Sequence, residues 1–212
     1  MARKLFLSSH AISDDQISSF TSLVGKELPS ISFALCENAA DPYPEDQKGF
    51  VYATRDTLST LGMRLTLVNL KDYIGTPSSL ASFLSNFDVM WFGGGNVFYL
   101  RWLMREAGFD HIAQQLVDSG VVYGGGSAGE IVAGPSLRHF DIVDDPRMSP
   151  DRIEEGLGLT ALTIIPHWGV ERYQAGLNEI KTLYENDGCT PITIRDGQAV
   201  VCDGDQWSVN PP

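Results

Sequence analysis

The stretch Val121-Val122-Tyr123-Gly124-Gly125-Gly126-Ser127-Ala128-Gly129 decides which fold the sequence predicts. Apolar residues run into glycines and a Gly-x-Ser-x-Gly core, and a short apolar segment over residues 130–133 follows. This order is typical of a strand, a tight turn and a helix, with the serine held on a turn that tolerates only small neighbours. The sequence therefore predicts a serine nucleophile at Ser127, with the N–H of Ala128 at a helix start, directed at a developing oxyanion.

Apolar or β-branched runs alternate with segments of helical spacing along most of the chain. Such alternation predicts an α/β fold, in which helices cover both faces of a parallel sheet. The expected strands are residues 4–8, 31–35, 65–70, 89–92, 121–123, 162–165, 192–194 and 199–202. The expected helices are residues 14–28, 45–61, 77–84, 97–107, 110–119 and 173–184.

Local signals refine this outline. Residues 13–16, Ser-Asp-Asp-Gln, have the form of a capping box, and the Thr76 hydroxyl is expected to cap a helix whose first turn holds Pro77. Near the end of the chain, Asp196-Gly197 and Asp203-Gly204 are turn pairs that favour hairpins and antiparallel edge strands. Because the sequence contains no internal repeat or long linker, we expect a single domain over residues 1–212.

Composition excludes several classes of protein. The chain has 212 residues, a formal net charge of −12 and only 15 Lys and Arg residues, which argues against a nucleic-acid partner. The sequence has no apolar run of about 18 residues and only a short apolar N-terminal stretch, so we expect neither membrane insertion nor secretion but a cytoplasmic location.

The three cysteines lack metal-ligand or disulfide spacing. No His, Asp and Glu cluster has ligand spacing either, so no metal or other cofactor is expected.

A serine hydroxyl needs a base, and the base needs an orienting group. His167 follows the apolar run 162–165 and a proline, so its ring is expected at the same sheet edge as Ser127. His10 is interpreted as a polar loop residue, and His111 and His139 as solvent-facing side chains.

Two aspartates remain candidates for the orienting acid. Asp196 follows the end of the expected strand 192–194, just as His167 follows the end of an expected strand, and it is the favoured choice. Asp141 lies in the loop beyond the nucleophile helix and stays open as the alternative.

Residues 93–96, Gly-Gly-Gly-Asn, follow another expected strand and open a helix. The N–H groups of Gly94 and Gly95 are expected to complete the oxyanion hole. The glycines are neither a dinucleotide fingerprint nor a Walker loop, because the required spacing and the Gly-Lys-Ser/Thr sequence are missing. Ligands of parallel sheets bind beyond the carboxyl ends of the strands, where these three features are predicted to meet.

Three motifs in this order resemble the peptidase E family (aspartyl dipeptidases, serine peptidase family S51). They are residues 93–98, Gly-Gly-Gly-Asn-Val-Phe, residues 125–129, Gly-Gly-Ser-Ala-Gly, and residues 166–168, Pro-His-Trp. The resemblance covers nearly the whole chain. It implies a flavodoxin-like, class I glutamine-amidotransferase-like three-layer fold in which a serine replaces the usual cysteine. It also implies that Ser127 is the nucleophile and His167 the base of a dipeptidase acting on short peptides. Asp196 and Asp141 fall near the two acids that the family offers.

Two departures from the family concern substrate choice. The segment 169–173 is compact where the dipeptidases have a longer loop that engages an acidic side chain. Glu130 stands where a small or neutral residue is common, and it is expected beside the substrate with Asn96. Arg172, and after it Arg138, are the candidate counter-charges. We therefore expect at most a modest preference for aspartate at the first position of the peptide.

Two other classes of function stay open. An esterase-type hydrolase shares Gly-x-Ser-x-Gly and has its acid between serine and histidine in the chain, which fits Asp141 and not Asp196. A non-catalytic binding module on the same scaffold is the second, although the presence of both Ser127 and His167 argues against it. A homodimer is compatible with the sequence.

Overall fold

The centre of the fold is a seven-stranded sheet in the order β3-β2-β4-β5-β1-β8-β9. The computed structural model describes residues 3–211. The five strands from β3 to β1 are parallel, whereas β8 runs antiparallel to β1 and forms a hairpin with β9. The strands are β1 (Lys4–Ser8), β2 (Ser32–Cys36), β3 (Arg64–Val68), β4 (Val89–Phe92), β5 (Val122–Gly126), β8 (Ala199–Asp203) and β9 (Gln206–Asn210). The predicted mostly parallel sheet with a C-terminal antiparallel hairpin is confirmed.

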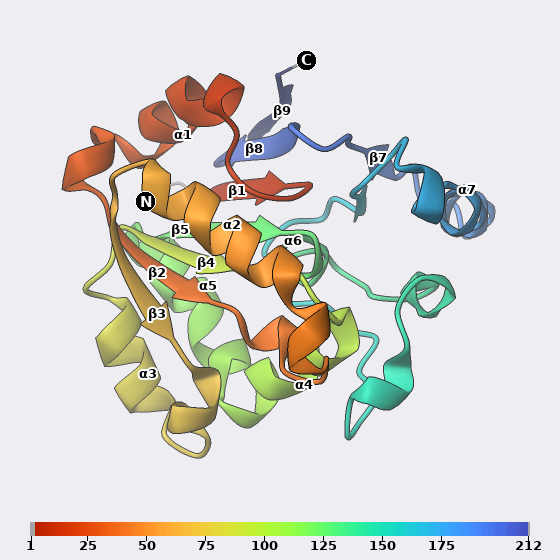
Figure 1. Ribbon diagram of the computed structural model, residues 1–212, viewed down its shortest axis with the longest axis horizontal. Helices are drawn as coiled ribbons and strands as arrows, with labels where there is room; N and C mark the ends of the chain where they lie inside the picture. The colour runs from red at the N-terminus through yellow and green to blue at the C-terminus, as the bar shows by residue number, and fades with distance from the viewer. Residues whose placement is uncertain (1–2, 212) are drawn as a thin grey trace.

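Helices cover both faces of this sheet and complete a three-layer α/β sandwich (Figure 1). On one face, Phe20 of α1 and Leu58 of α2 pack with Trp91 of the sheet. The opposite face carries the larger apolar cluster, to which α3, α4 and α5 contribute. The bounds are α1 (Ile17–Val24), α2 (Gly49–Thr60), α3 (Pro77–Leu84), α4 (Val97–Glu106) and α5 (Phe109–Ser119). Within residues 3–211, no helix combines the length and the apolar character that crossing a membrane requires.

One predicted helix boundary and one predicted helix cap differ from the structure. The helix expected over 14–28 begins with the capping box, in which Ser13 N–H donates to Gln16 Oε1 at 2.9 Å. It ends at Val24, because Gly25 adopts a left-handed φ of 79°. The prediction that Thr76 caps α3 is wrong. Its backbone lies at φ −129° and ψ 56°, outside the extended region of a capping residue, and its hydroxyl donates to Tyr73 O instead.

The segment from β6 to β7 forms a separate unit beside the main sheet. β6 (Ile164–Ile165) and β7 (Ile192–Thr193) pair in parallel in a two-stranded sheet, joined by α7 (Glu171–Asn186) at the right of Figure 1. The expectation that both strands extend the main sheet, with a hairpin at Asp196-Gly197, is therefore wrong. A helical crossover is the usual connection between parallel strands, and it brings the residues that follow β6 and β7 to one edge.

The glycines after Tyr123 belong to β5, although the sequence predicted that the strand ends before them. A Cβ on Gly124 would lie 2.3 Å from Cε3 of Trp91, and one on Gly126 would lie 2.0 Å from the carbonyl oxygen of His10. Glycine here allows neighbouring groups to lie directly against the strand. The strand consequently delivers Ser127 to its carboxyl end beside the chain at His10.

Candidate active site

Ser127 occupies a strained turn between β5 and the short helix α6 (Ala128–Ile131). Its φ is 53° and its ψ is −110°, a conformation that non-glycine residues rarely adopt. The backbone N–H of Ser127 donates to Ser8 O at 3.2 Å, which fixes the turn to β1. This is the predicted elbow, and it leaves the Ser127 side chain at the wall of a cavity.

The glycine loop between β4 and α4 lies directly against Ser127. A Cβ on Gly94 would be 3.7 Å from Ser127 Oγ. Among residues 3–211, the N–H groups of Gly94 and Gly95 donate to no protein acceptor. Ala128 is the first residue of α6, where helix geometry leaves the N–H without an intrahelical partner. Three amide groups near Ser127 are thus available to a developing negative charge.

The glycine loop rests on the turn that follows β2. Gly95 has a φ of 146°, and a Cβ there would lie 2.3 Å from the carbonyl carbon of Ala39. The next amide, that of Asn96, donates to Ala39 O at 2.8 Å. Only glycine fits at position 95, because a side chain would collide with the backbone of this turn.

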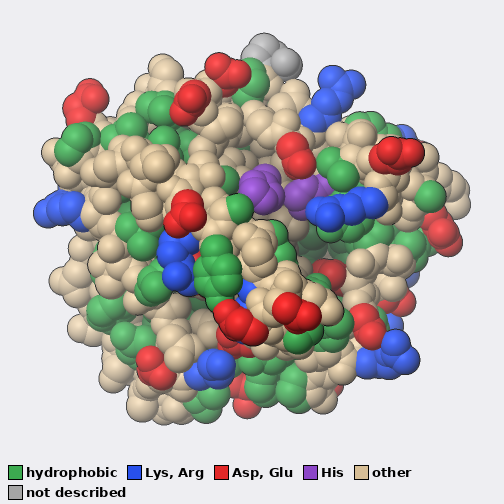
Figure 2. All heavy atoms as spheres, viewed as in Figure 1, with side chains coloured by type: hydrophobic (Ala, Val, Ile, Leu, Met, Phe, Trp, Pro, Cys, Tyr) green, Lys and Arg blue, Asp and Glu red, His purple; other side chains and the backbone are tan. Residues whose placement is uncertain are grey.

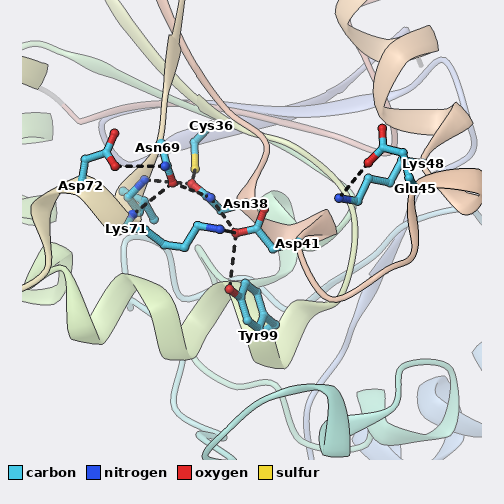
Figure 3. Close-up of polar contacts among 10 residues, drawn as sticks. Cys36, Asn38, Asp41, Glu45, Lys48, Asn69, Lys71, Asp72 and Tyr99 are labelled. Carbon is cyan, nitrogen blue, oxygen red and sulfur yellow. Dashed lines mark hydrogen bonds and ion pairs between the residues drawn. The ribbon is translucent and has the colours of Figure 1, made fainter.

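A polar network holds that turn in place (Figure 3). Asn38 Nδ2 donates to Asp41 Oδ2 at 2.8 Å and to Asn69 Oδ1 at 2.9 Å. Asp41 also accepts from the hydroxyl of Tyr99 at 3.3 Å and pairs with Lys71 at 2.9 Å. The turn under Gly95 is therefore tied both to the segment after β3 and to α4.

His167 and Asp196 meet at the shared edge of β6 and β7. His167 Nδ1 lies 2.7 Å from Asp196 Oδ1. Ser9 joins them, because its hydroxyl donates to Asp196 Oδ1 at 2.6 Å and accepts from the backbone N–H of His167 at 2.8 Å. The hydrogen bond from His167, and then that from Ser9, lower the pKa of Asp196 to about 2. The carboxylate is thus ionised and held against the imidazole.

Ser127 and His167 line the same cavity, which has a volume of about 270 Å³. Figure 2 shows histidine side chains beside a hollow near the middle of one face. Its walls come from α2, the glycine loop, the segment after α6 and the start of α7, and they are mostly aromatic or aliphatic. The lining residues are His10, Tyr43, Phe50, Thr54, Gly94, Gly95, Ser127, Ile131, Phe140, Val143, Asp144, Pro166, His167, Arg172, Tyr173 and Leu177.

Three rings and a guanidinium group form a row along one wall. The rings of His10 and His167 have centroids 6.3 Å apart, and those of His167 and Tyr173 are 5.5 Å apart. The guanidinium group of Arg172 lies over the Tyr173 ring at 4.5 Å. His10, which the sequence predicts to be a polar loop residue, belongs to this wall, and burial of its ring lowers its pKa by desolvation.

The expectation that Glu130 lies beside the substrate is wrong, because its side chain is buried away from the cavity. Only 1% of this residue is exposed, and it does not line the cavity. Neither Oε atom has a hydrogen-bond partner within the described part of the chain, and burial raises the pKa of the carboxyl well above its usual range. Because α6 directs this side chain into the core, Glu130 cannot set the charge of the cavity.

Three other candidates are also absent from the cavity wall. Asp141 is exposed, and its carboxylate lies 3.3 Å from Arg152 instead of beside His167. Arg138 pairs with Asp187 at 3.4 Å. Asn96 is fully buried and caps α4, because its side chain accepts from the N–H of Tyr99. None of these three residues thus lines the cavity that Ser127 and His167 share.

Two residues of the site had no sequence signal. Ser9 contacts His167 across 158 positions of the chain, so no local pattern indicates it. Asp144 lines the cavity, and burial raises its pKa to about 6. Its place in a run of loop residues gave no indication of a cavity position. Across residues 3–211, no cluster of three or more His, Cys, Asp and Glu side chains is arranged to hold a metal ion.

Comparison with known proteins identifies relatives of the same kind. An uncharacterized peptidase of Listeria innocua, Lin0382, is 26% identical over 120 residues, which are 56% of each chain. Peptidase E of Streptomyces coelicolor is 28% identical over 129 residues, which are 58% of this chain and 52% of that one. The matched region thus spans about half the length of these curated relatives.

Solved structures show the same fold. A putative peptidase E from Listeria monocytogenes superposes with a TM-score of 0.83 at 19% identity, covering 99% of this chain and 98% of that one. A peptidase from an acI-B1 Actinobacterium has a TM-score of 0.68 at 19% identity, covering 99% and 87%. The family model of peptidase family S51 matches residues 15–210, nearly the whole chain. This chain therefore belongs to peptidase family S51, a family of serine-type peptidases.

Proposed function

We propose that this protein is a serine exopeptidase that hydrolyses short peptides, with Ser127 as nucleophile, His167 as base and Asp196 as the orienting acid. The observation that carries the proposal is the cavity in which Ser127 and His167 share a wall, with Asp196 bonded to the far nitrogen of the imidazole. Family membership supports the same reaction class.

In this mechanism His167 takes the Ser127 proton on Nε2, because Nδ1 is engaged by Asp196. Ser127 Oγ bonds to the carbonyl carbon of the substrate, whose oxygen becomes negatively charged. The C–N bond then breaks, and the departing amine takes the proton from His167. Water repeats the sequence on the acyl-enzyme and releases the free acid.

The available N–H groups of Gly94, Gly95 and Ala128 are suited to stabilise the tetrahedral intermediate. Donors that are already oriented need no reorganisation when the negative charge develops. Loss of one such donor typically costs about 100-fold to 1,000-fold in kcat. The tight packing of Gly95 on Ala39 supports this role, because it fixes the loop before substrate arrives.

The shape of the cavity supports a short peptide as substrate. Phe50 from α2, Phe140 from the segment after α6 and Tyr173 from α7 stand around it, so its walls come from three sides. Side walls of this kind suit the end of a peptide better than the middle of an extended chain. A dipeptide is accordingly the simplest substrate, with aspartate tolerated at the first position instead of required.

A fluorophosphonate probe tests the reaction class directly. We expect it to label the wild-type protein and the Ser79→Ala variant, whose exposed serine lies on α3, and not Ser127→Ala. Wild-type protein that has not been exposed to the probe should also release amino acids from dipeptides such as Asn-Leu. Labelling with hydrolysis of p-nitrophenyl acetate but of no peptide would make the protein an esterase. Absence of labelling would favour a binding module.

A further inference from the structure

Asp144 is a charged group on the cavity wall that the proposed mechanism does not use. It lies in the segment between α6 and β6 and is partly buried. Its Oδ2 accepts a hydrogen bond from the backbone N–H of Val97 at 2.9 Å. No Lys, Arg or His side chain within residues 3–211 forms an ion pair with this carboxylate. It therefore enters the cavity as an acceptor without a cationic partner.

The bond to Val97 places this carboxylate next to the glycine loop. Val97 is only two residues beyond Gly95, whose N–H is assigned to the oxyanion hole. In a peptide, the amino nitrogen of the first residue is separated from the first carbonyl carbon by a single Cα, about 2.5 Å in space. A group that binds beside the oxyanion loop is thus within reach of the amino terminus of the substrate.

The surroundings of Asp144 favour a cation from outside the protein. Tyr43 and Tyr173 line the same cavity, and Asp144 interacts electrostatically with Tyr43 and with His167, a group that can carry a positive charge. Arg172 is engaged with the face of Tyr173. In a cavity wall of this kind, an ammonium group from the substrate gains more from a carboxylate than it would in water.

We propose that Asp144 binds the α-ammonium group of the first residue of the substrate and so restricts hydrolysis to peptides with a free amino terminus. The inference rests on the proposed peptidase function. A positively charged side chain of the substrate is the other source of the same chemistry, and the experiment separates the two.

The experiment compares Asn-Leu, N-acetyl-Asn-Leu and Lys-Leu on wild type, Asp144→Asn and Asp145→Asn. Asparagine keeps an acceptor for the Val97 N–H and removes only the charge. Asp145 is a matched control, since it is the adjacent acid and its carboxylate bonds to Arg147 instead of facing the cavity. We expect wild type and Asp145→Asn to prefer Asn-Leu over its acetylated form by about 100-fold or more in kcat/KM.

In Asp144→Asn we expect kcat/KM for Asn-Leu to fall by a similar factor, mainly through KM, and the preference over the acetylated peptide to disappear. Fluorophosphonate labelling of Ser127 should stay at the wild-type rate, because the probe carries no ammonium group. Equal hydrolysis of free and acetylated peptide by wild type would overturn the inference and leave the peptidase intact. A loss confined to Lys-Leu would assign Asp144 to a side chain instead, which also overturns it. If wild type is neither labelled nor active, the proposed function itself fails.

Discussion

Ser9 and His167 are joined by a hydrogen bond in which the backbone N–H of His167 donates to the hydroxyl of Ser9 at 2.8 Å. The same hydroxyl donates to Asp196 at 2.6 Å, so one buried side chain fixes both the backbone of His167, the proposed base, and the carboxylate of Asp196. His167 has a φ of 57°, and this bond helps to hold that strained conformation. We accordingly expect Ser9 to position the proposed base and acid.

Replacing Ser9 by alanine should lower kcat by about tenfold to 100-fold and leave KM nearly unchanged, because the substrate does not touch Ser9. Ser8→Ala is the matched control. Ser8 is equally buried, and its hydroxyl bonds to Ala11 O instead of the catalytic residues. Both variants should lose about 1 kcal/mol of unfolding free energy, measured by urea denaturation. A similar loss of kcat in both would show that the effect is only structural.

Ser127 and His167 should behave as one unit. We expect Ser127→Ala, His167→Ala and the double variant each to lose kcat by a similar factor, on the order of 10⁴ to 10⁶, because members of a triad are strongly non-additive. Steady-state hydrolysis of Asn-Leu measures this. Losses that multiply in the double variant would mean that the two residues act independently.

Asparagine substitutions should distinguish the two candidate acids. Asp196→Asn should reduce kcat by up to about 10⁴, because an amide holds the wrong tautomer of the imidazole. Asp141→Asn should have little effect, since Asp141 is exposed and pairs with Arg152. Circular dichroism spectra should show that both variants are folded. If Asp141→Asn causes the large loss of kcat and Asp196→Asn does not, the role proposed for Asp196 is wrong.

The buried carboxyl of Glu130 should make stability depend on pH. Its pKa is raised in the folded state, so above about pH 4.5 the unfolded chain releases a proton that the folded chain keeps, and stability falls as pH rises. Glu130→Gln removes this dependence. The free energy of unfolding of Glu130→Gln should therefore exceed that of wild type by an amount that grows by up to about 1.4 kcal/mol per pH unit above pH 5.

Urea denaturation between pH 5 and pH 8 measures this gain. The exposed Glu179→Gln on α7 is the control and should show no such trend. A gain for Glu130→Gln that does not change with pH would mean that Glu130 stays ionised in the core.

Preference for aspartate at the first position should stay modest, under about 2 kcal/mol, which is tenfold to thirtyfold. Asp144 brings negative charge to the cavity, and the guanidinium group of Arg172 is stacked on Tyr173. The values of kcat/KM for Asp-Leu, Asn-Leu and Met-Leu measure the preference. Arg138→Ala is the control for Arg172→Ala, because Arg138 pairs outside the cavity. A preference above a thousandfold that Arg172→Ala abolishes would contradict this prediction.

Features encoded in consecutive residues could be predicted from the sequence. The elbow at Ser127 needs small neighbours on both sides, and those neighbours are adjacent in the chain. The position of Asp196 at a strand end was predictable for a similar reason, since this residue follows a short β-branched run.

What depends on contacts across the fold was not predictable. The runs that form β6 and β7 are apolar, and nothing in them tells which sheet they join. Glu130 is close to Ser127 in sequence, but the direction of its side chain is set by how α6 packs. Ser9 and Asp144 reach the site only because distant segments fold over one another.

The left-handed backbone at Ser127 and His167 has a consequence for how the family changes over time. Glycine would adopt either conformation without strain, so the two residues proposed for the chemistry weaken the fold that carries them. Natural selection retains such residues only while hydrolysis benefits the cell. In a lineage that no longer needs the activity, replacement of these residues by glycine would relieve the backbone strain and stabilise the fold. The fold would then persist without the activity.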